Sequence, residues 1–290
     1  MICTFDPRLL FWSTEEYEQA QYRQQLMESC FLHMDWLQEM ACSELVLDRE
    51  AERLYSRFPW NRPLYPELST FTHLFFEFIT KFPRIQLSSR HSVDDITIQP
   101  DLCGEGFEED REPFMTALLS LIKNEDSFKY LLTYEHDNFR DRRFLDVITP
   151  KHSYELSILA DEDDWCVSFL EFGERDTPEH FRKLIRGYYL KYYQQHPRYS
   201  EHVWEYVITE EFTKTLEKCR HQEAVFQDVI DSLTVKIYNI QSASKIDEKK
   251  FGRLYVGGRR GDRIEYEEKE ETIYFLRYLS SSEHDDYKIR

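Results

Sequence analysis

No segment of this 290-residue sequence approaches the roughly 20 consecutive apolar residues that a membrane-spanning helix needs. The N-terminus meets charge already at Asp6 and Arg8 and lacks the apolar stretch of a signal peptide. The six cysteines include no CxxC pair, so neither a disulfide framework nor a zinc site is indicated. We therefore expect a cytoplasmic protein with reduced thiols and no membrane partner.

Motifs that bind small cofactors are also lacking. The sequence contains no G-x-x-x-x-G-K-[ST] loop, no G-x-G-x-x-G fingerprint and no nucleophile motif around a Ser or Cys. The segments His33-Met34-Asp35 and Glu135-His136-Asp137 offer metal ligands, but no third ligand follows either at helical spacing. We predict no cofactor and no metal site.

The net charge of -18 disfavours nonspecific binding of the whole chain to nucleic acid. The charge is uneven, because Glu201 to Arg290 hold 15 Lys+Arg against 19 Asp+Glu, whereas the first 200 residues hold 22 against 36. The acidity thus belongs mainly to the N-terminal part. The acid clusters Glu108-Glu109-Asp110 and Asp161 to Asp164 are expected to be solvated loops.

Hydrophobic residues make up 41% of the chain, enough for a sizeable core, and their spacing predicts an α+β protein. Residues 1–125 are expected to be a helical region, with one short alternating stretch at Ile96 to Ile98. Its helices are expected at about 14–42, 48–58, 67–82 and 113–124.

Residues 126–200 are expected to be rich in strands and to belong to the same N-terminal domain. The strands are predicted at YLLTY, RFLDVI, YELSIL and WCVSFLEF, and a helix begins at Thr177-Pro178. The domain boundary is placed in the polar stretch from Gln194 to Glu201.

The C-terminal domain, 201–290, has the predicted order strand, helix, helix, strand, strand, strand. The strands fall at Val203 to Ile208, Phe251 to Val256, Arg263 to Glu267 and Thr272 to Tyr278, and a tight turn at Glu268 to Glu270 joins the last two. Thr209 caps the first helix, and the second begins at His221. These elements favour an antiparallel sheet with two helices on one face.

The segments YVITEEFTKTLEK, GRLYVGGRRGDRIEYEEKEETIYFLRY and HDDY follow one another in this domain. From about His202 to Arg290, their order and spacing resemble the RelE/ParE toxin superfamily. That resemblance implies one of two activities: metal-independent mRNA cleavage on the ribosome, or poisoning of DNA gyrase. No family is recognised for residues 1–200.

Basic residues and glycines are concentrated between Lys245 and Arg263, a segment that contains seven basic and three acidic residues. Glycines permit close backbone approach to a ligand, and guanidinium groups bind phosphate bidentately. The family pattern implies that Arg263 holds the phosphate and that Arg253, Lys249 or Lys250 stabilises developing charge. It implies His284 or Tyr287 as acid and base, and Arg259 and Arg260 complete the expected RNA-binding set. Alternatively, the glycines make ordinary turns and the arginines pair with nearby glutamates.

The leading hypothesis is a toxin-like effector that cleaves RNA or blocks translation, restrained by the acidic N-terminal part, in a toxin–antitoxin or antiviral defence system. RNA or the ribosome, and a protein partner such as an antitoxin, are its expected partners. The acidic run from Glu265 to Glu271 departs from the basic character that ribosome binding requires. The alternative is a non-enzymatic subunit of a larger complex that uses the fold for contact.

A second basic and aromatic segment is FRKLIRGYYLKYYQQHPRY, on the helix from Pro178 to Gln195. Interleaved cations and tyrosines suit RNA phosphates and stacked bases. The simpler interpretation is a surface helix whose tyrosines cover a junction between domains.

Overall fold

The computed structural model of the protein describes residues 1–40, 44–46, 60, 64–81, 96–103, 108, 111–123, 128–136, 139, 142–219, 222–241, 252–257 and 261–282. The chain divides into two compact units, Met1–Asp164 and Trp165–Arg290. Within the described residues, no helix combines the length and the apolar character needed to cross a bilayer.

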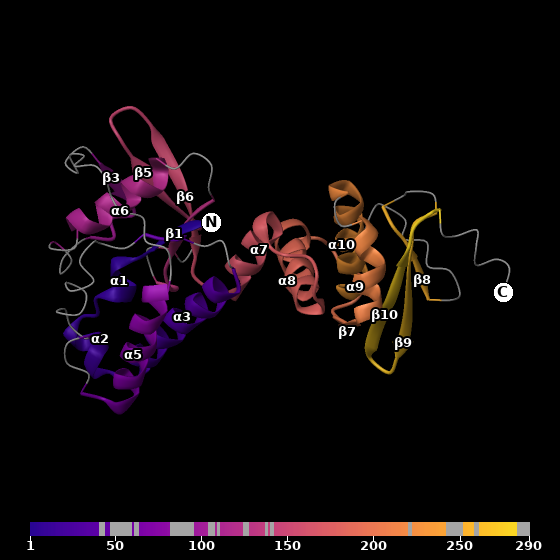
Figure 1. The fold of residues 1–290 in the computed structure, drawn as a ribbon, viewed down its shortest axis with the longest axis horizontal. Coiled ribbons are helices and arrows are strands. Elements are labelled where there is room, and N and C mark those ends of the chain that lie inside the picture. The colour runs from indigo at the N-terminus through magenta and orange to yellow at the C-terminus, as the bar shows by residue number, and fades with distance from the viewer. Residues whose placement is uncertain are drawn as a thin grey trace. The chain divides into compact units, whose positions relative to one another are not determined.

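The first unit is built on a six-stranded mixed sheet with the order β2-β1-β4-β6-β5-β3 (Figure 1). Strands β2, β1, β4 and β6 run parallel, whereas β5 and β3 are antiparallel to their neighbours. The strands are β1 (Ile2–Phe5), β2 (Glu44–Leu45), β3 (Thr97–Gln99), β4 (Lys129–Leu132), β5 (Phe144–Ile148) and β6 (Ser153–Leu159). The helices are α1 (Pro7–Leu10), α2 (Thr14–Glu18), α3 (Ala20–Glu39), α5 (Pro66–Lys81) and α6 (Arg111–Lys123).

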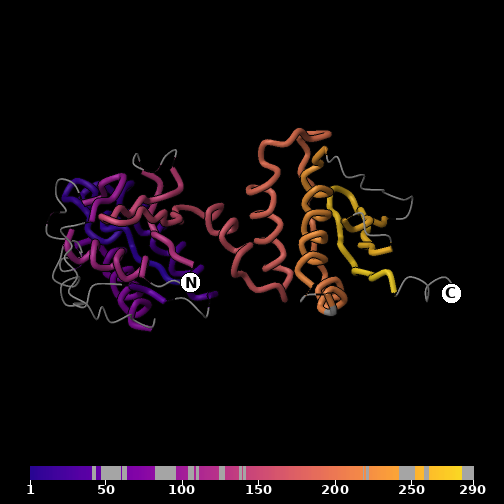
Figure 2. The backbone as a smooth tube through the Cα atoms, turned by 90° about the horizontal axis from the view of Figure 1, so that it is seen from above, coloured from indigo at the N-terminus to yellow at the C-terminus, as the bar shows by residue number. Residues whose placement is uncertain are grey.

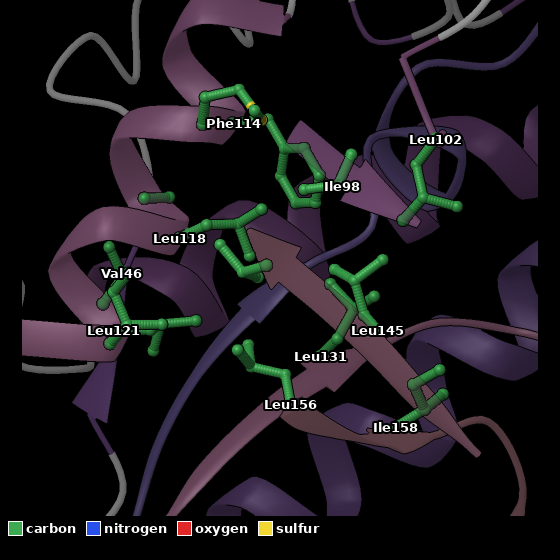
Figure 3. Packing of buried hydrophobic residues seen from close by; sticks show 14 of the residues in the cluster. Val46, Ile98, Leu102, Phe114, Leu118, Leu121, Leu131, Leu145, Leu156 and Ile158 are labelled. Atoms are coloured by element: carbon green, nitrogen blue, oxygen red, sulfur yellow. The ribbon is translucent and has the colours of Figure 1, made fainter. Parts of the chain in front are cut away.

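Helices cover both faces of this sheet. Figure 3 shows α6 residues such as Phe114 and Leu118 packed on Leu131, Leu145 and Leu156 of the strands, all of them buried. On the other face, the Phe5 ring lies 5.8 Å from Phe75 of α5 and 6.3 Å from His33 of α3. Coverage on both faces explains why β1 is buried along its whole length.

The second unit begins with α7 (Glu162–Phe172), whose first turn belongs to the first unit, and α8 (Pro178–Tyr188), which continues into the π-helical turn η3 (Tyr189–Tyr193). Then follow β7 (Glu205–Ile208), α9 (Glu210–Leu216), η4 (Glu217–Cys219), α10 (Glu223–Ile237), β8 (Arg253–Tyr255), β9 (Arg263–Lys269) and β10 (Thr272–Leu279). The predicted helices and strands of the C-terminal domain are confirmed as elements. The turn after β9 falls at Glu270-Glu271.

The four strands form a sheet with the order β7-β10-β9-β8. It is mixed rather than antiparallel, because β7 runs parallel to β10. Helices α9 and α10 lie on one face, where Phe212 of α9 meets Phe275 of β10 at 6.4 Å (Figure 1). Two helices on one face match the prediction, whereas a wholly antiparallel sheet was wrong. The long connection that follows β7 begins with α9 and α10, and a connection of this length allows β7 to pair in parallel with β10.

Helix α8 packs on α10, so that α10 lies between α8 and the sheet (Figure 2). The buried Phe181 ring lies 5.7 Å from both Phe212 and Phe226. The structural division between the units therefore falls before α8, whereas the sequence placed a boundary after it. Helix α8 belongs to the second unit because its apolar side chains are buried there, although a polar segment follows it.

Two expectations for the N-terminal part are corrected. The segment WCVSFLEF is not a strand but the body of α7, because Asp161 accepts a hydrogen bond from the Asp164 amide at 2.8 Å and starts a helix. Asp161 to Asp164 is accordingly a helix cap and first turn, not a loop. Residues 1–125 also contribute β1, β2 and β3 to the sheet, so they are less purely helical than predicted. The helix expected at 48–58 lies outside the described residues.

Candidate functional site

The face of the C-terminal sheet turned away from α9 and α10 carries charged and aromatic side chains. Along β9, Ile264 and Tyr266 are buried toward the helices, so Arg263, Glu265 and Glu267 point the other way. Cross-strand pairing places Arg253, Tyr255, Tyr274 and Arg277 beside them. We call these residues the open face: Arg253, Tyr255, Arg263, Glu265, Glu267, Lys269, Tyr274 and Arg277.

Glu265 occupies the centre of the open face and holds two of its three arginines. Its carboxylate lies 2.9 Å from Nη2 of Arg253 and 2.5 Å from Nε of Arg277. The Glu265 side chain is only 13% exposed, so these charge-assisted bonds are partly shielded from water. Arg253 and Arg277 therefore reach the surface with much of their charge already balanced.

Arg263 differs from its two neighbours. Its guanidinium lies over the Tyr255 ring, with Cζ 5.1 Å from the ring centroid. Its Nε atom is buried without a hydrogen-bond partner, and no carboxylate of the described residues pairs with it. A buried donor without an acceptor carries an energetic cost, and the charge of this guanidinium is not balanced by an acidic neighbour that the structure describes. Among the open-face arginines in the described chain, Arg263 is the one suited to take a phosphate.

The structure brings together the sequence-predicted residues Arg253 and Arg263 on one face. Arg277, Tyr255 and Tyr274 were not predicted. Alternation along the strands could have placed Tyr255 and Tyr274 there, whereas Arg277 reaches this face only through the register shift in β10. The other predicted residues lie outside the described residues: Lys249, Lys250, Arg259, Arg260, His284 and Tyr287.

One of the clustered glycines has a structural role. Gly252 adopts a φ of +61°, and a Cβ atom there would meet the Tyr266 carbonyl oxygen at 2.2 Å. The same backbone accepts a hydrogen bond from the Tyr266 amide at 2.8 Å. Gly252 thus permits β8 to pair closely with β9, which fixes Arg253 opposite Glu265.

The tyrosines of the predicted basic and aromatic helix pack mainly inside the second unit. Tyr189 stacks on Tyr238 with ring centroids 3.9 Å apart, and Arg198 lies over both rings. The Tyr193 hydroxyl donates to Asp231 of α10 at 2.5 Å. Burial raises the pKa of Tyr188 to about 12, so this phenol stays neutral. These contacts give the tyrosines a structural role, as in the simpler interpretation, but the contacts lie inside one unit and not at a junction between domains.

A polar cluster lies at the carboxyl ends of β1 and β4 in the first unit. The buried Asp6 carboxylate accepts hydrogen bonds from the Thr133 hydroxyl at 2.7 Å, from Nε2 of His136 at 3.1 Å and from the Arg8 amide at 2.9 Å. After β1 the chain continues to β2 on one side, and after β4 it continues to β5 and β6 on the other side. The strand order therefore reverses between β1 and β4, a place where ligands bind in many α/β sheets. Sequence analysis considered His136 only as a metal ligand and missed the cluster, because its members come from segments far apart in the chain.

His33, at the edge of this cluster, is fully buried and donates from Nε2 to the Thr133 carbonyl at 2.6 Å. Burial lowers the pKa of His33 to about 4, so the ring is neutral at physiological pH. The His33 bond and the Asp6 bonds together tie α3, β1 and β4.

One group of metal-ligating side chains occurs within the described residues. It consists of Glu174 and Asp176, on the connection between α7 and α8, and His180, in the first turn of α8. The sequence segments His33-Met34-Asp35 and Glu135-His136-Asp137 do not form such a group within the described chain: His33 bonds to a backbone carbonyl, and Nε2 of His136 faces Asp6 and Thr133.

No known family model matches this chain, and no curated protein shows significant similarity to it.

Proposed function

We propose that the C-terminal unit is a toxin-like effector that binds RNA on the open face of its sheet and cleaves it, or blocks translation, without a metal. Residues 1–164 restrain it. The proposal combines the resemblance of about His202 to Arg290 to the RelE/ParE superfamily with the chemistry of the open face.

The observation that carries the proposal is the state of Arg263. The Arg263 guanidinium lies over the Tyr255 ring and has no acidic partner among the described residues, so its charge is available to a nucleotide. Its free donors suit a phosphate, and the neighbouring Tyr255 and Tyr274 offer surfaces on which bases stack.

Cleavage at such a site would rest on positioning and charge. Arg263 would bind the scissile phosphate and stabilise the negative charge that grows on it during attack by the adjacent ribose 2′-hydroxyl. Arg253 and Arg277 could add to this stabilisation once the phosphate competes with Glu265 for them. His284 and Tyr287 remain the predicted acid and base.

Expression in bacteria of residues 165–290, as wild type and as Arg263→Ala, tests the proposal. The wild-type unit should arrest growth and cleave mRNA at sites that primer extension can map, and Arg263→Ala should do neither. Arg182→Ala on α8 removes the same charge on the far side of α10 and should remain toxic. Undiminished toxicity of Arg263→Ala would refute the assignment. A DNA-damage response without mRNA loss would point instead to gyrase.

A specific observation favours the second candidate, a non-enzymatic subunit of a larger complex. Glu265 neutralises Arg253 and Arg277, and Glu267 pairs with Lys269 at 2.9 Å, so most cations of the open face already have acidic partners. Such balanced, half-buried pairs suit a protein interface as well as a nucleic acid. Harmless, soluble expression of the wild-type unit would support this candidate.

A further inference from the structure

The connection between α7 and α8 brings three ligating side chains of different kinds to one point. The ligand atoms of Glu174, Asp176 and His180 all lie within 4.8 Å of one another. Nδ1 of His180 is 2.6 Å from a carboxylate oxygen of Asp176. Zinc bound tetrahedrally at about 2.0 to 2.1 Å holds such atoms about 3.3 Å apart. Small rotations of the two carboxylates would therefore suffice to enclose an ion.

The imidazole of this group is already fixed in place. His180 is 9% exposed, and its ring packs 5.6 Å from the Phe169 ring. Its backbone amide donates to the hydroxyl of Thr177, the cap of α8, at 3.1 Å. The cap sets Asp176 and His180 one helical turn apart, on the same side of the helix start. A ligand held in this way loses little freedom when it binds an ion.

The charges around the group favour a cation. Glu171 pairs with Lys191 at 3.5 Å, and Glu179 pairs with Arg182 at 3.5 Å. Arg175, which stands between Glu174 and Asp176 in the sequence, turns away to Glu223 at 2.6 Å and lies over the Phe226 ring. No basic side chain of the described residues neutralises Glu174. Two exposed carboxylates converge on one imidazole.

We propose that Glu174, Asp176 and His180 bind a divalent first-row transition metal ion, with Zn²⁺ the ion best suited to one imidazole nitrogen and two carboxylate oxygens. Imidazole disfavours Mg²⁺ and Ca²⁺, which take oxygen ligands. Three protein ligands leave a coordination position open to water or to a side chain. The ion would fix the connection between α7 and α8. This inference does not depend on RNA binding by the open face.

Titration of the full chain with ZnCl₂ tests the site, by calorimetry and by competition with a chromophoric chelator. One equivalent should bind to the wild type. Glu174→Gln and Asp176→Asn should each lower the affinity at least about tenfold, since loss of a ligand costs no less than loss of its outer-shell support. Both side chains are exposed, so both variants should keep the fold, as circular dichroism can verify. Glu179→Gln, on the same turn but outside the group, is the matched control and should bind like the wild type.

Zinc should also raise the melting temperature of the wild type and of Glu179→Gln, and that of Asp176→Asn less, because an ion that binds only the folded state stabilises it by an amount that grows with its affinity. MgCl₂ at the same concentration should have no such effect. Absence of zinc binding by the wild type would overturn the proposal. Identical zinc isotherms for the wild type, Glu174→Gln and Asp176→Asn would overturn it as well, because the ion would then lie elsewhere.

Discussion

The three arginines of the open face illustrate what single residues in a strand can and cannot reveal. The spacing of glycines and arginines pointed to Arg253 and Arg263, which the structure places on one face. Arg277 was not predicted because the register of β10 shifts between Phe275 and Arg277, which breaks the alternation of side chains between the two faces of the sheet. The pairing of Arg253 and Arg277 with one carboxylate depends on that register. It could not be read from a linear sequence in which several glutamates compete as partners.

His33 predicts an acid-sensitive contribution to stability. Its pKa is about 4 in the folded protein, against an ordinary value of 6.5. Below about pH 6.5 the unfolded chain therefore binds a proton that the folded chain resists, and stability is lost progressively toward pH 4. From pH 7 to pH 5 the loss should be about 2 kcal/mol.

The comparison variant is His33→Gln, which cannot titrate. Its deficit in unfolding free energy relative to the wild type should shrink as the pH falls from 7 to 5, in urea titrations followed by tryptophan fluorescence. A deficit that stays constant over this range would show that His33 titrates normally.

At the scale of elements, most helices and strands followed from periodicity and caps. Thr209 and Thr177 start α9 and α8 as their hydroxyl caps predict, and the helix expected at about 67–82 is α5. The errors arose where tertiary burial overrode local pattern. WCVSFLEF reads as a strand by composition, yet α7 buries Trp165, Cys166 and Phe169 at helical spacing. Strand β1 was missed because four buried residues carry no periodic signal of their own.

The first turn of α7 predicts a pH effect of the opposite sign. Burial raises the pKa of Asp164 to about 6, with nearby Asp161 adding to the shift, although the Ala160 amide and Arg143 favour the charged form. The folded state therefore holds this proton more tightly than the unfolded chain does. The associated stability is present below about pH 4 and is lost as the pH rises through about 6.

Asp164→Asn removes this titration. The stability of the wild type relative to Asp164→Asn should fall between pH 4 and pH 6 and then level off, in the same urea titrations. A relative stability that rises over this window would mean that the hydrogen bonds to Asp164 outweigh its burial.

At the scale of the whole molecule, the division of the chain predicts which fragment folds. Helix α8 buries Phe181, Leu184 and Ile185 in the second unit. A fragment that starts at residue 201 exposes the surface of α10 that these side chains cover, whereas a fragment that starts at residue 165 keeps it. Residues 165–290 should be monodisperse with a cooperative thermal transition, and residues 201–290 should melt lower or aggregate. Equal melting temperatures would show that α8 contributes nothing to this core.

Restraint of the effector by the acidic first unit is the other prediction at this scale. Asp161 and Asp164, which were expected to lie in a solvated loop, are engaged by the α7 cap and by Arg143. A restraining contact would therefore rest on other acidic residues of the unit. If it exists, residues 165–290 should bind RNA more tightly than the full chain, and the gap should narrow as salt rises. Equal affinity at low salt would instead leave the first unit as a docking surface for another protein.

The central claim is that Arg263 on the open face binds RNA phosphate, and the direct test is the affinity of residues 165–290 for a short single-stranded RNA at several salt concentrations. Arg263→Ala should weaken binding about tenfold or more. The loss of one phosphate contact should also reduce the slope of log K against log[salt] by about 0.7. Glu265→Gln should strengthen RNA binding, because it releases Arg253 and Arg277. Glu267→Gln changes the net charge equally but frees neither arginine, so it should increase the affinity for RNA less. Arg182→Ala should bind like the wild type. The account is contradicted if Arg263→Ala binds RNA as tightly as the wild type, or if Arg182→Ala weakens binding as much as Arg263→Ala does.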